Sequence, residues 1–265
     1  MKNHVTISIN SNPFKVEKGK SVLSVCNENG IEVPSLCHNE ALEPCGACRL
    51  CMVEVIKGPH KKGLTASCTL KADDGLEILT NTEKIKQHRK ILFELYLAEA
   101  PDSEVIKEMA AKYGVFETRF PKRKKHNDPL NNKCVLCGQC VRICEEVMHT
   151  AAIYFTGRGY LTSINTPYLQ ESDVCLGCKA CVEVCPTGAV EYEDLDGFRI
   201  MKSWSNTKIP LKKCPVCGRF FAPESLVSFT LNKMDTELKK AIKEICPICR
   251  KTGYNGFKYP PPKPL

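Results

Sequence analysis

The sequence predicts an α+β protein built from three consecutive cysteine-bearing modules. Eighteen of its 265 residues are cysteine, and they fall into groups at residues 26–68, 134–185 and 214–249. Alternating apolar residues near the N-terminus indicate a β-hairpin, and residues 82–98 repeat apolar side chains at a helical spacing. A hairpin, a short helix and further strands make a small mixed sheet, to which a helical segment is then added.

Local signals define the elements of the N-terminal segment. Ser21 can cap a short helix, and Gly30 can end it in the left-handed conformation. The expected elements are a hairpin over 5–16, a helix over 22–29, and strands over 49–56, 64–67 and 76–79.

Residues 82–133 contain no cysteine, and their pattern predicts helices and a linker in place of strands. Helices are expected over 82–98 and 103–113, the second ended by Gly114. Residues 115–133 carry two prolines and the basic run 122–125, which is the composition of a linker. We therefore expect a module boundary there. Near the C-terminus, a helix is expected over 235–244 and a polyproline-like tail over 259–265.

Composition excludes several classes of protein. No stretch reaches the roughly 18–20 apolar residues of a membrane helix, and the N-terminus has no apolar signal-peptide core. We expect a cytoplasmic protein, in which thiols stay reduced and so many cysteines serve to bind metal. Residues 201–265 hold 13 Lys/Arg against 4 Asp/Glu. Nucleic-acid binding is one interpretation of this basic tail, but without an arginine-rich run we favour a solvated or partner-facing surface.

The central cysteines form a repeat. The spacing C-x2-C-x2-C-x3-C begins at Cys134 and recurs 41 residues later at Cys175. Runs of four cysteines are typical of [4Fe–4S] clusters in bacterial-type ferredoxins, in which the fourth cysteine binds the other cluster. Zinc sites take paired knuckles instead. The crossed assignment gives one cluster to Cys134, Cys137, Cys140 and Cys185, and the other to Cys175, Cys178, Cys181 and Cys144.

The first and third groups are less specific on spacing alone. A plant-type [2Fe–2S] site needs one cysteine, a C-x2-C pair and a distant fourth, and either Cys45/Cys48 or Cys48/Cys51 could be the pair. The third group is two C-P-x-C knuckles that suit zinc or a mononuclear, rubredoxin-like iron. Because the intervening segment is lysine-rich with few aromatic residues, we favour zinc. Its ligands would be Cys214, Cys217, Cys246 and Cys249.

A family resemblance covers about residues 1–195. The stretch from Cys37 through Cys45-Gly-Ala-Cys-Arg-Leu-Cys51 to Ala66-Ser-Cys68, followed by the doubled four-cysteine motif, resembles the N-terminal iron–sulfur region of iron-only hydrogenases and of the complex I large iron–sulfur subunit. The resemblance implies that Cys37, Cys48, Cys51 and Cys68 hold a [2Fe–2S] cluster and that Cys45 is extra. Cys26, on its short helix, is expected to be a buried small hydrophobe.

The resemblance also implies a domain organisation. The expected segments are a plant-type [2Fe–2S] ferredoxin (β-grasp) domain at 1–80, a helical connector and basic linker at 81–133, a bacterial-type 2[4Fe–4S] ferredoxin domain at 134–195, and a zinc-ribbon-like module with a proline-rich tail at 196–265. Many relatives bind a further cluster through one His and three Cys between the first two domains. Residues 69–133 lack cysteine, so that cluster is not expected, and His88 there is expected on the surface.

The resemblance finally implies a function. No hydrogen-activating or molybdenum domain is expected, and no catalytic residue; the chain would relay single electrons. The implied partners are a flavin- and NAD(P)H-binding subunit and ferredoxin or a second redox subunit, in an electron-bifurcating transhydrogenase- or hydrogenase-like complex. The alternatives are the same role in an NAD-dependent formate dehydrogenase, or an iron–sulfur and zinc regulator that binds nucleic acid.

Overall fold

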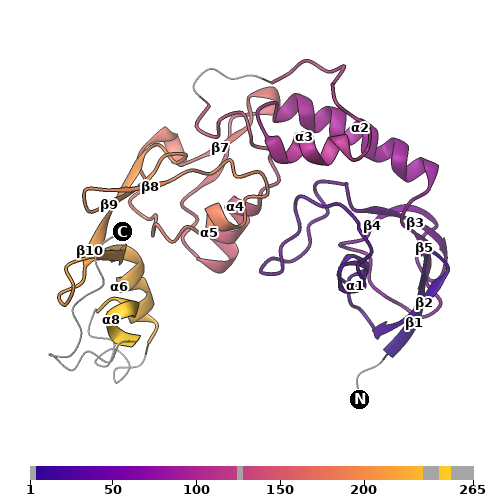
Figure 1. Ribbon diagram of the computed structural model, residues 1–265, viewed down its shortest axis with the longest axis horizontal. Helices are drawn as coiled ribbons and strands as arrows, with labels where there is room; N and C mark the ends of the chain where they lie inside the picture. Colours follow the sequence, from indigo (N-terminus) through magenta and orange to yellow (C-terminus); the bar gives the residue numbers. More distant parts are fainter. Residues whose placement is uncertain (1–3, 124–127, 235–244, 252–265) are drawn as a thin grey trace.

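The computed structural model describes residues 4–123, 128–234 and 245–251. The expected helix at 235–244 and the proline-rich tail lie outside the described residues. Figure 1 shows the N-terminal sheet, the α2–α3 pair, the central loops and the C-terminal sheet following one another along an arc. No helix within the described ranges is long and apolar enough to cross a membrane.

The N-terminal module is a five-stranded mixed sheet with one helix against it. Its strand order is β2-β1-β5-β3-β4, with β1 antiparallel to β2 and parallel to β5. The elements are β1 (His4–Ile9), β2 (Asn12–Glu17), α1 (Val22–Glu28), β3 (Met52–Lys57), β4 (Gly63–Ala66) and β5 (Glu77–Leu79).

Alternation in β1 explains the packing of this sheet. Val5, Ile7 and Ile9 are buried, and they form one core with the apolar face of α1. The Ser21 side chain accepts a hydrogen bond from Ser24 N and so caps α1, and Gly30 follows with φ 69°. The hairpin, the helix and its two end signals are confirmed.

Two helices connect this module to the next. They are α2 (Glu83–Glu99), capped by Thr82, and α3 (Glu104–Ala111), capped by Ser103. Their apolar faces pack over Leu36 and Leu50, the residues that flank the N-terminal cysteines. The α2–α3 pair therefore covers the cysteine loops of the first module.

The segment expected as a solvated linker is instead packed where the structure describes it. Val115 is buried in the core under α2 and α3, and Leu130 is buried in the core of the central module. Arg123, from the basic run, is also buried and bonds to the Glu99 carboxylate and the Thr162 carbonyl. A carboxylate and a carbonyl at the junction accept from the two terminal nitrogens of this guanidinium, so its charge is paired and does not hold the segment in solvent.

The central module is made mostly of loops. Its elements are α4 (Gln139–Arg142), a π-helical turn η1 (Ile143–Val147), β6 (Tyr154–Thr156), η2 (Gly159–Leu161), β7 (Ser163–Asn165), η3 (Pro167–Leu169) and α5 (Ala180–Glu183). Strands β6 and β7 pair antiparallel. The starts of α4 and α5 are 41 residues apart, the period of the cysteine repeat, so the duplication extends to the backbone.

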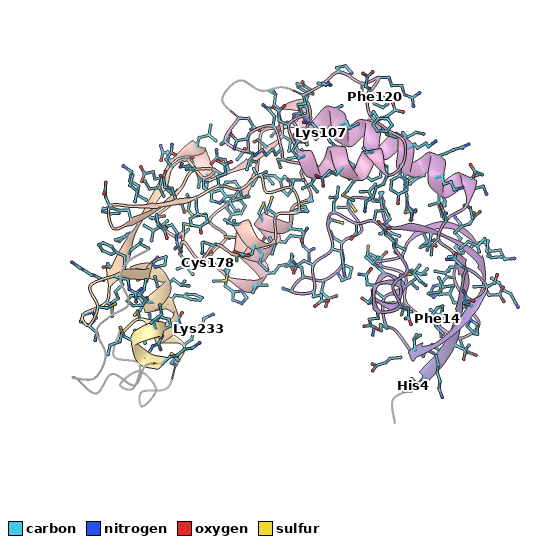
Figure 2. All side chains as sticks on the ribbon, in the orientation of Figure 1. His4, Phe14, Lys107, Phe120, Cys178 and Lys233 are labelled. Carbon is cyan, nitrogen blue, oxygen red and sulfur yellow. The ribbon has the colours of Figure 1, made fainter. Side chains whose placement is uncertain are left out.

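The C-terminal sheet begins inside the expected second domain. Strands β8 (Glu193–Leu195), β9 (Phe198–Met201), β10 (Thr207–Lys213) and β11 (Phe220–Pro223) form one antiparallel sheet, followed by α6 (Glu224–Asn232) and α8 (Pro247–Lys251). The β8–β9 pair spans the expected boundary at residue 196. The sheet and α6 pack on the loop between Cys175 and Cys178, and Figure 2 shows Cys178 on the side of the central module that faces the C-terminal one. Ser225 Oγ donates to the Leu176 carbonyl of this loop.

Candidate metal centres

Four cysteines of the first module are buried together. Cys37, Cys48, Cys51 and Cys68 each have at most 3% of their surface exposed. Cys48 N donates to Cys37 Sγ at 3.3 Å, and the Sγ atoms of Cys51 and Cys68 are 3.4 Å apart. Four converging thiols in a dry pocket are a donor set that suits a [2Fe–2S] cluster.

Cys45 does not join this group. It is exposed, its sulfur lies 4.0 Å from the Cys37 carbonyl, and it faces the Arg142 guanidinium of α4. The two alternatives for the C-x2-C pair, equal by spacing, therefore differ in burial: Cys51 lies inside the pocket and Cys45 outside it.

Hydrogen bonds between the four buried thiols lower the pKa of one partner in each pair and raise that of the other. A hydrogen bond from Cys37 lowers the pKa of Cys48 to about 5, and the same contact raises the pKa of Cys37. Likewise, a hydrogen bond from Cys68 lowers the pKa of Cys51 to about 7. Since the thiolate is the form that binds metal, the pocket already favours two of its four ligands in the binding form.

The two central cysteine loops have the same backbone path. Leu136 and Gly138 adopt positive φ in the first loop, and Gly177 and Lys179 do so at the equivalent positions of the second. Glycine occupies a different position in each loop, so backbone shape, not residue type, is what repeats. At Gly177 a Cβ atom would lie 3.1 Å from Pro223, so this glycine also lets the C-terminal sheet approach.

The fourth cysteine of each run lies beside the opposite loop. Burial raises the pKa of Cys134 to about 12, with further contributions from the neighbouring Cys137 and Cys185. Burial likewise raises the pKa of Cys175 to about 11, and Cys144 contributes. These electrostatic neighbours are the ones that crossed ligation requires.

Both crossing sulfurs accept the same kinds of hydrogen bond. The backbone N–H of Ala152 donates to Cys144 Sγ and that of Ala189 donates to Cys185 Sγ, each at 3.3 Å. A threonine hydroxyl lies 3.3 Å from Cys144 Sγ and another 3.7 Å from Cys185 Sγ, from Thr150 and Thr187 respectively. Each crossing sulfur is therefore held by a matched pair of neighbours, one backbone N–H and one threonine hydroxyl.

A buried connection joins the first module to the central one. Leu36 N donates to Cys48 Sγ at 3.4 Å, and the Leu36 carbonyl accepts from Gln139 Nε2 at 2.7 Å. Gln139 stands between Cys137 and Cys140 in the chain. Tyr96 lies at the same junction and donates to the Cys48 carbonyl at 2.9 Å. The two modules are therefore packed directly against each other at their cysteine loops.

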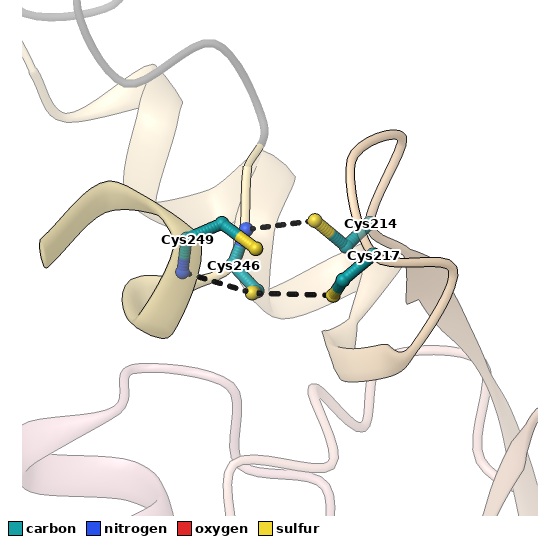
Figure 3. Close-up of side chains that lie close together, drawn as sticks. All are labelled: Cys214, Cys217, Cys246 and Cys249. Carbon is teal, nitrogen blue, oxygen red and sulfur yellow. Dashed lines mark hydrogen bonds between the residues drawn. The ribbon is translucent and has the colours of Figure 1, made fainter. Parts of the chain in front are cut away.

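The C-terminal module brings its four cysteines together. Cys214 and Cys217 lie in the turn between β10 and β11, and Cys246 and Cys249 lie at the start of α8 (Figure 3). All four sulfurs lie within 4.8 Å of one another, and those of Cys217 and Cys246 are 3.8 Å apart. Tetrahedral metal–sulfur bonds of about 2.3 Å place sulfurs about 3.8 Å apart, so the set fits a single ion.

Cys217 is further prepared for a metal by its neighbour Arg219. The backbone N–H of Arg219, followed by its guanidinium, lowers the pKa of Cys217 to about 6. Cys217 is therefore largely ionised at neutral pH. This geometry suits zinc and mononuclear iron equally, because both are four-coordinate with sulfur.

Several contacts had no signal in the sequence. The bridging roles of Leu36 and Gln139 depend on which loops meet. Arg89 is buried and donates to the carbonyls of Leu50 and Met52, which fixes the loop around Cys51. His88, expected on the surface, is half-buried and bonds to the Arg49 carbonyl at 3.1 Å, because α2 lies across that loop. Cys26 is buried as expected.

Comparisons with known proteins agree with this arrangement. The family model of the 2Fe-2S iron-sulfur cluster binding domain matches residues 2–83, and that of the 4Fe-4S dicluster domain matches residues 133–189. The chain therefore has domains for both kinds of cluster.

Three curated relatives are similar over most of this chain. A subunit of the NADH-quinone oxidoreductase of Rhizobium meliloti (strain 1021) is 33% identical over 70% of this chain and 24% of its own length. The NADH-ubiquinone oxidoreductase 75 kDa subunit of Reclinomonas americana is 30% identical over 70% of this chain and 29% of its own length. The alpha subunit of the NADPH-Fe(3+) oxidoreductase of Geobacter sulfurreducens is 32% identical over 81% of this chain and 27% of its own length. The chain thus spans about a quarter of the length of these relatives.

A solved structure shares the fold. A chain from the crystal structure of NAD+-reducing [NiFe]-hydrogenase in the H2-reduced state has a TM-score of 0.59 and 24% identity, covering 69% of this chain and 85% of that one. The two domain matches identify these segments: residues 2–83 and 133–189 belong to the 2Fe-2S iron-sulfur cluster binding and 4Fe-4S dicluster domain families. Over about 70% of its length the chain is similar to subunits of NADH-quinone and NADH-ubiquinone oxidoreductases.

Proposed function

We propose that this chain is an electron-transfer subunit that relays single electrons through one [2Fe–2S] and two [4Fe–4S] clusters. The observation that carries this proposal is the hydrogen-bonded connection from Cys48 through both backbone groups of Leu36 to Gln139. It links the pocket of the first module to the first central loop through buried groups. Because the two modules are in direct contact, a further cluster between them is not needed.

The proposed ligand sets follow the burial and neighbours of the cysteines. When bound, the clusters supply one-electron redox chemistry, while the protein holds them, excludes water and donates hydrogen bonds to their sulfurs. The [2Fe–2S] ligands are Cys37, Cys48, Cys51 and Cys68; the first [4Fe–4S] set is Cys134, Cys137, Cys140 and Cys185; the second is Cys175, Cys178, Cys181 and Cys144.

We infer a structural zinc ion at the C-terminal cysteines, with mononuclear iron as the alternative. The site lies beyond the second central loop, and its module packs on that loop through Pro223 and Ser225. An ion there would hold the β10–β11 turn against α8 and so brace the surface that covers the second cluster.

The proposed partners come from the names of the relatives. Two relatives are named as subunits of NADH oxidoreductases and one as a subunit of an NADPH oxidoreductase. A partner that binds flavin and NAD(P)H would deliver electrons to the [2Fe–2S] module, and the two [4Fe–4S] clusters would lead to ferredoxin or another redox subunit. We favour a hydrogenase-like or electron-bifurcating complex over a formate dehydrogenase.

The test removes the first cluster and leaves the fold in place. Deleting residues 1–80 would uncover Leu97 and Phe93, which pack against this module, so paired ligand substitutions are cleaner. In the complex purified with its flavoprotein, Cys48→Ser together with Cys51→Ser should block reduction of both [4Fe–4S] clusters by NAD(P)H, followed by EPR. Dithionite should still reduce them.

Cys45→Ser is the matched control, since this cysteine is in the same loop but outside the pocket. It should keep the rate of NAD(P)H-driven reduction. If the double variant still reduces both [4Fe–4S] clusters at the full rate, the first module is not on the electron path and the proposal fails.

A further inference from the structure

The only tryptophan of the chain points its single donor at a cysteine of the second central loop. Trp204 lies in the turn between β9 and β10 and is 1% exposed. Its indole Nε1–H donates to Cys181 Sγ at 3.4 Å. An indole offers one donor and no acceptor, so this buried group directs its one side-chain hydrogen bond to the sulfur.

The first central loop has no counterpart of this contact. Cys140 occupies the position equivalent to Cys181, and within 4–123, 128–234 and 245–251 no side chain donates a hydrogen bond to its sulfur. The backbone donors of Ala152 and Ala189 are matched between the halves, whereas the Gln139 side chain donates to Cys137 in the first loop only. At the equivalent third cysteines, Cys140 and Cys181, the two proposed clusters therefore differ by the indole donor.

The C-terminal sheet holds Trp204 rigidly in place. Trp204 N donates to the Met201 carbonyl, and the Trp204 carbonyl accepts from Thr207 N at 2.9 Å and Thr207 Oγ1 at 2.6 Å. On the same sheet, Arg199 is buried and donates to the Gly177 carbonyl at 2.7 Å. A donor and a cation thus reach the second loop from residues beyond the matched dicluster range of 133–189.

We propose that Trp204 raises the reduction potential of the second [4Fe–4S] cluster through its hydrogen bond to Cys181. This rests on the ligand sets proposed above. Reduction adds negative charge to the cluster and its sulfurs, so a fixed donor stabilises the reduced state more than the oxidised one. Because an indole does not titrate near neutral pH, the effect is independent of pH. The indole would therefore favour the reduced state of the cluster that the C-terminal sheet covers.

The primary test is Trp204→Phe in the full complex, with potentials from redox titrations followed by EPR. One hydrogen bond contributes about a factor of ten to an equilibrium, which for a one-electron couple is about 59 mV. We expect the potential of the second cluster to fall by about 59 mV at every pH tested, while the first cluster keeps its potential. Selective 15N labelling of the indole identifies the second cluster's signal by its nitrogen coupling.

Met201→Leu is the matched control. Met201 is buried, lines the same cavity as Cys181 and Cys144, and offers no donor. This substitution alters packing at similar volume and should leave the potential unchanged. Equal shifts in Trp204→Phe and Met201→Leu would mean that packing sets the potential, and would overturn the proposal.

A second route keeps the fold intact if Trp204→Phe lowers stability. Since the chain has one tryptophan, feeding cells 3-benzothienylalanine replaces the ring N–H by sulfur at this position in the chain. The same fall in potential is expected, and an unchanged potential contradicts the proposal. A wild-type protein that contains only one [4Fe–4S] cluster would instead refute the proposed ligand sets, which is a distinguishable failure.

Discussion

The central module and the C-terminal module both gather four thiols, but they gather them differently. Each proposed central set takes three cysteines from one tight loop and the fourth from the other half of the repeat. The C-terminal set takes two from the β10–β11 turn and two from the start of α8. Three ligands in one loop surround a large cluster from one side, whereas two and two converge on a point.

Hydrogen bonding follows the same division. Central sulfurs accept hydrogen bonds from inside their loops, as from Leu136 N to Cys134, and also from distant Ala152, Ala189 and Trp204. In the C-terminal set, Cys246 N donates to Cys214, Cys249 N donates to Cys246, and Arg219 in the adjoining turn donates to Cys217. The surrounding fold can thus adjust the central sites, as the proposed electron carrier needs, whereas these donors to the C-terminal sulfurs come from the site's own turn and helix, as the proposed structural ion needs.

The largest expected effect comes from breaking the three-plus-one arrangement. Cys144→Ser should remove or strongly alter the cluster at Cys175, Cys178 and Cys181, with a loss of up to about four irons per chain. The cluster at Cys134 should be affected less. EPR and iron analysis of the purified protein measure both. Damage confined to the Cys134 cluster would show that the sulfurs are not crossed.

Metal analysis sharpens the contrast between the modules. The proposed sites hold about ten iron atoms and one zinc per chain. Cys217→Ser should release the zinc and leave the iron content unchanged. Eleven irons without zinc would assign a mononuclear iron to the C-terminal site, and the contrast between adjustable and structural sites would no longer hold.

A smaller effect is expected from substitutions in the first module. Cys51→Ser should abolish or alter the [2Fe–2S] EPR signal, because Cys51 lies in the buried pocket beside Cys68. Cys45→Ser should preserve the signal, because Cys45 is exposed beside Arg142. The reverse result would place the ligand pair at Cys45 and Cys48.

The smallest effects concern the two cysteines outside every set. Cys26→Ser should lower the free energy of unfolding by about 1–3 kcal/mol, because it buries a hydroxyl in an apolar core. Cys45→Ser, on the surface, should change it by less than about 0.5 kcal/mol. Chemical denaturation of both variants measures the difference, and equal costs would contradict the burial of Cys26.

Their reactivity should differ in the same sense. Burial raises the pKa of Cys26 from 9.0 to about 11, so the folded thiol is neutral where an unfolded one ionises. Its contribution to stability is full below pH 9 and is lost as the pH rises through 11. At about pH 9, iodoacetamide should modify Cys45 in the folded protein and Cys26 only after unfolding, as mass spectrometry can detect.

Local signals predicted much of this fold. Capping by Ser21 and the alternation in β1 depend on neighbours in the chain, and both predicted elements formed. Thr82 and Ser103 also cap their helices, although these caps were not predicted. The cysteine groups were also readable, since motif spacing encodes which thiols can meet. The expected strand at 49–56 begins later, at Met52, because Arg49 adopts positive φ in the cysteine loop.

What the sequence could not predict depends on contacts between distant segments. A segment rich in proline and lysine gives no indication of which carboxylate will pair with Arg123. Gln139 is an ordinary helix residue until Leu36 is placed opposite it. Trp204 is an isolated aromatic residue until the C-terminal sheet folds over the second loop. These contacts join residues 24, 103 and 23 positions apart.

The interlocked cysteines have a consequence for biosynthesis. The second proposed set is complete only when Cys181 has been translated, and the first waits for Cys185, four residues later. Neither set can therefore close while the loop at Cys134 emerges alone from the ribosome. With the proposed ligand sets, cluster delivery would be a late event that acts on the whole repeat at once, and a nascent chain stalled before residue 181 would present two incomplete sites.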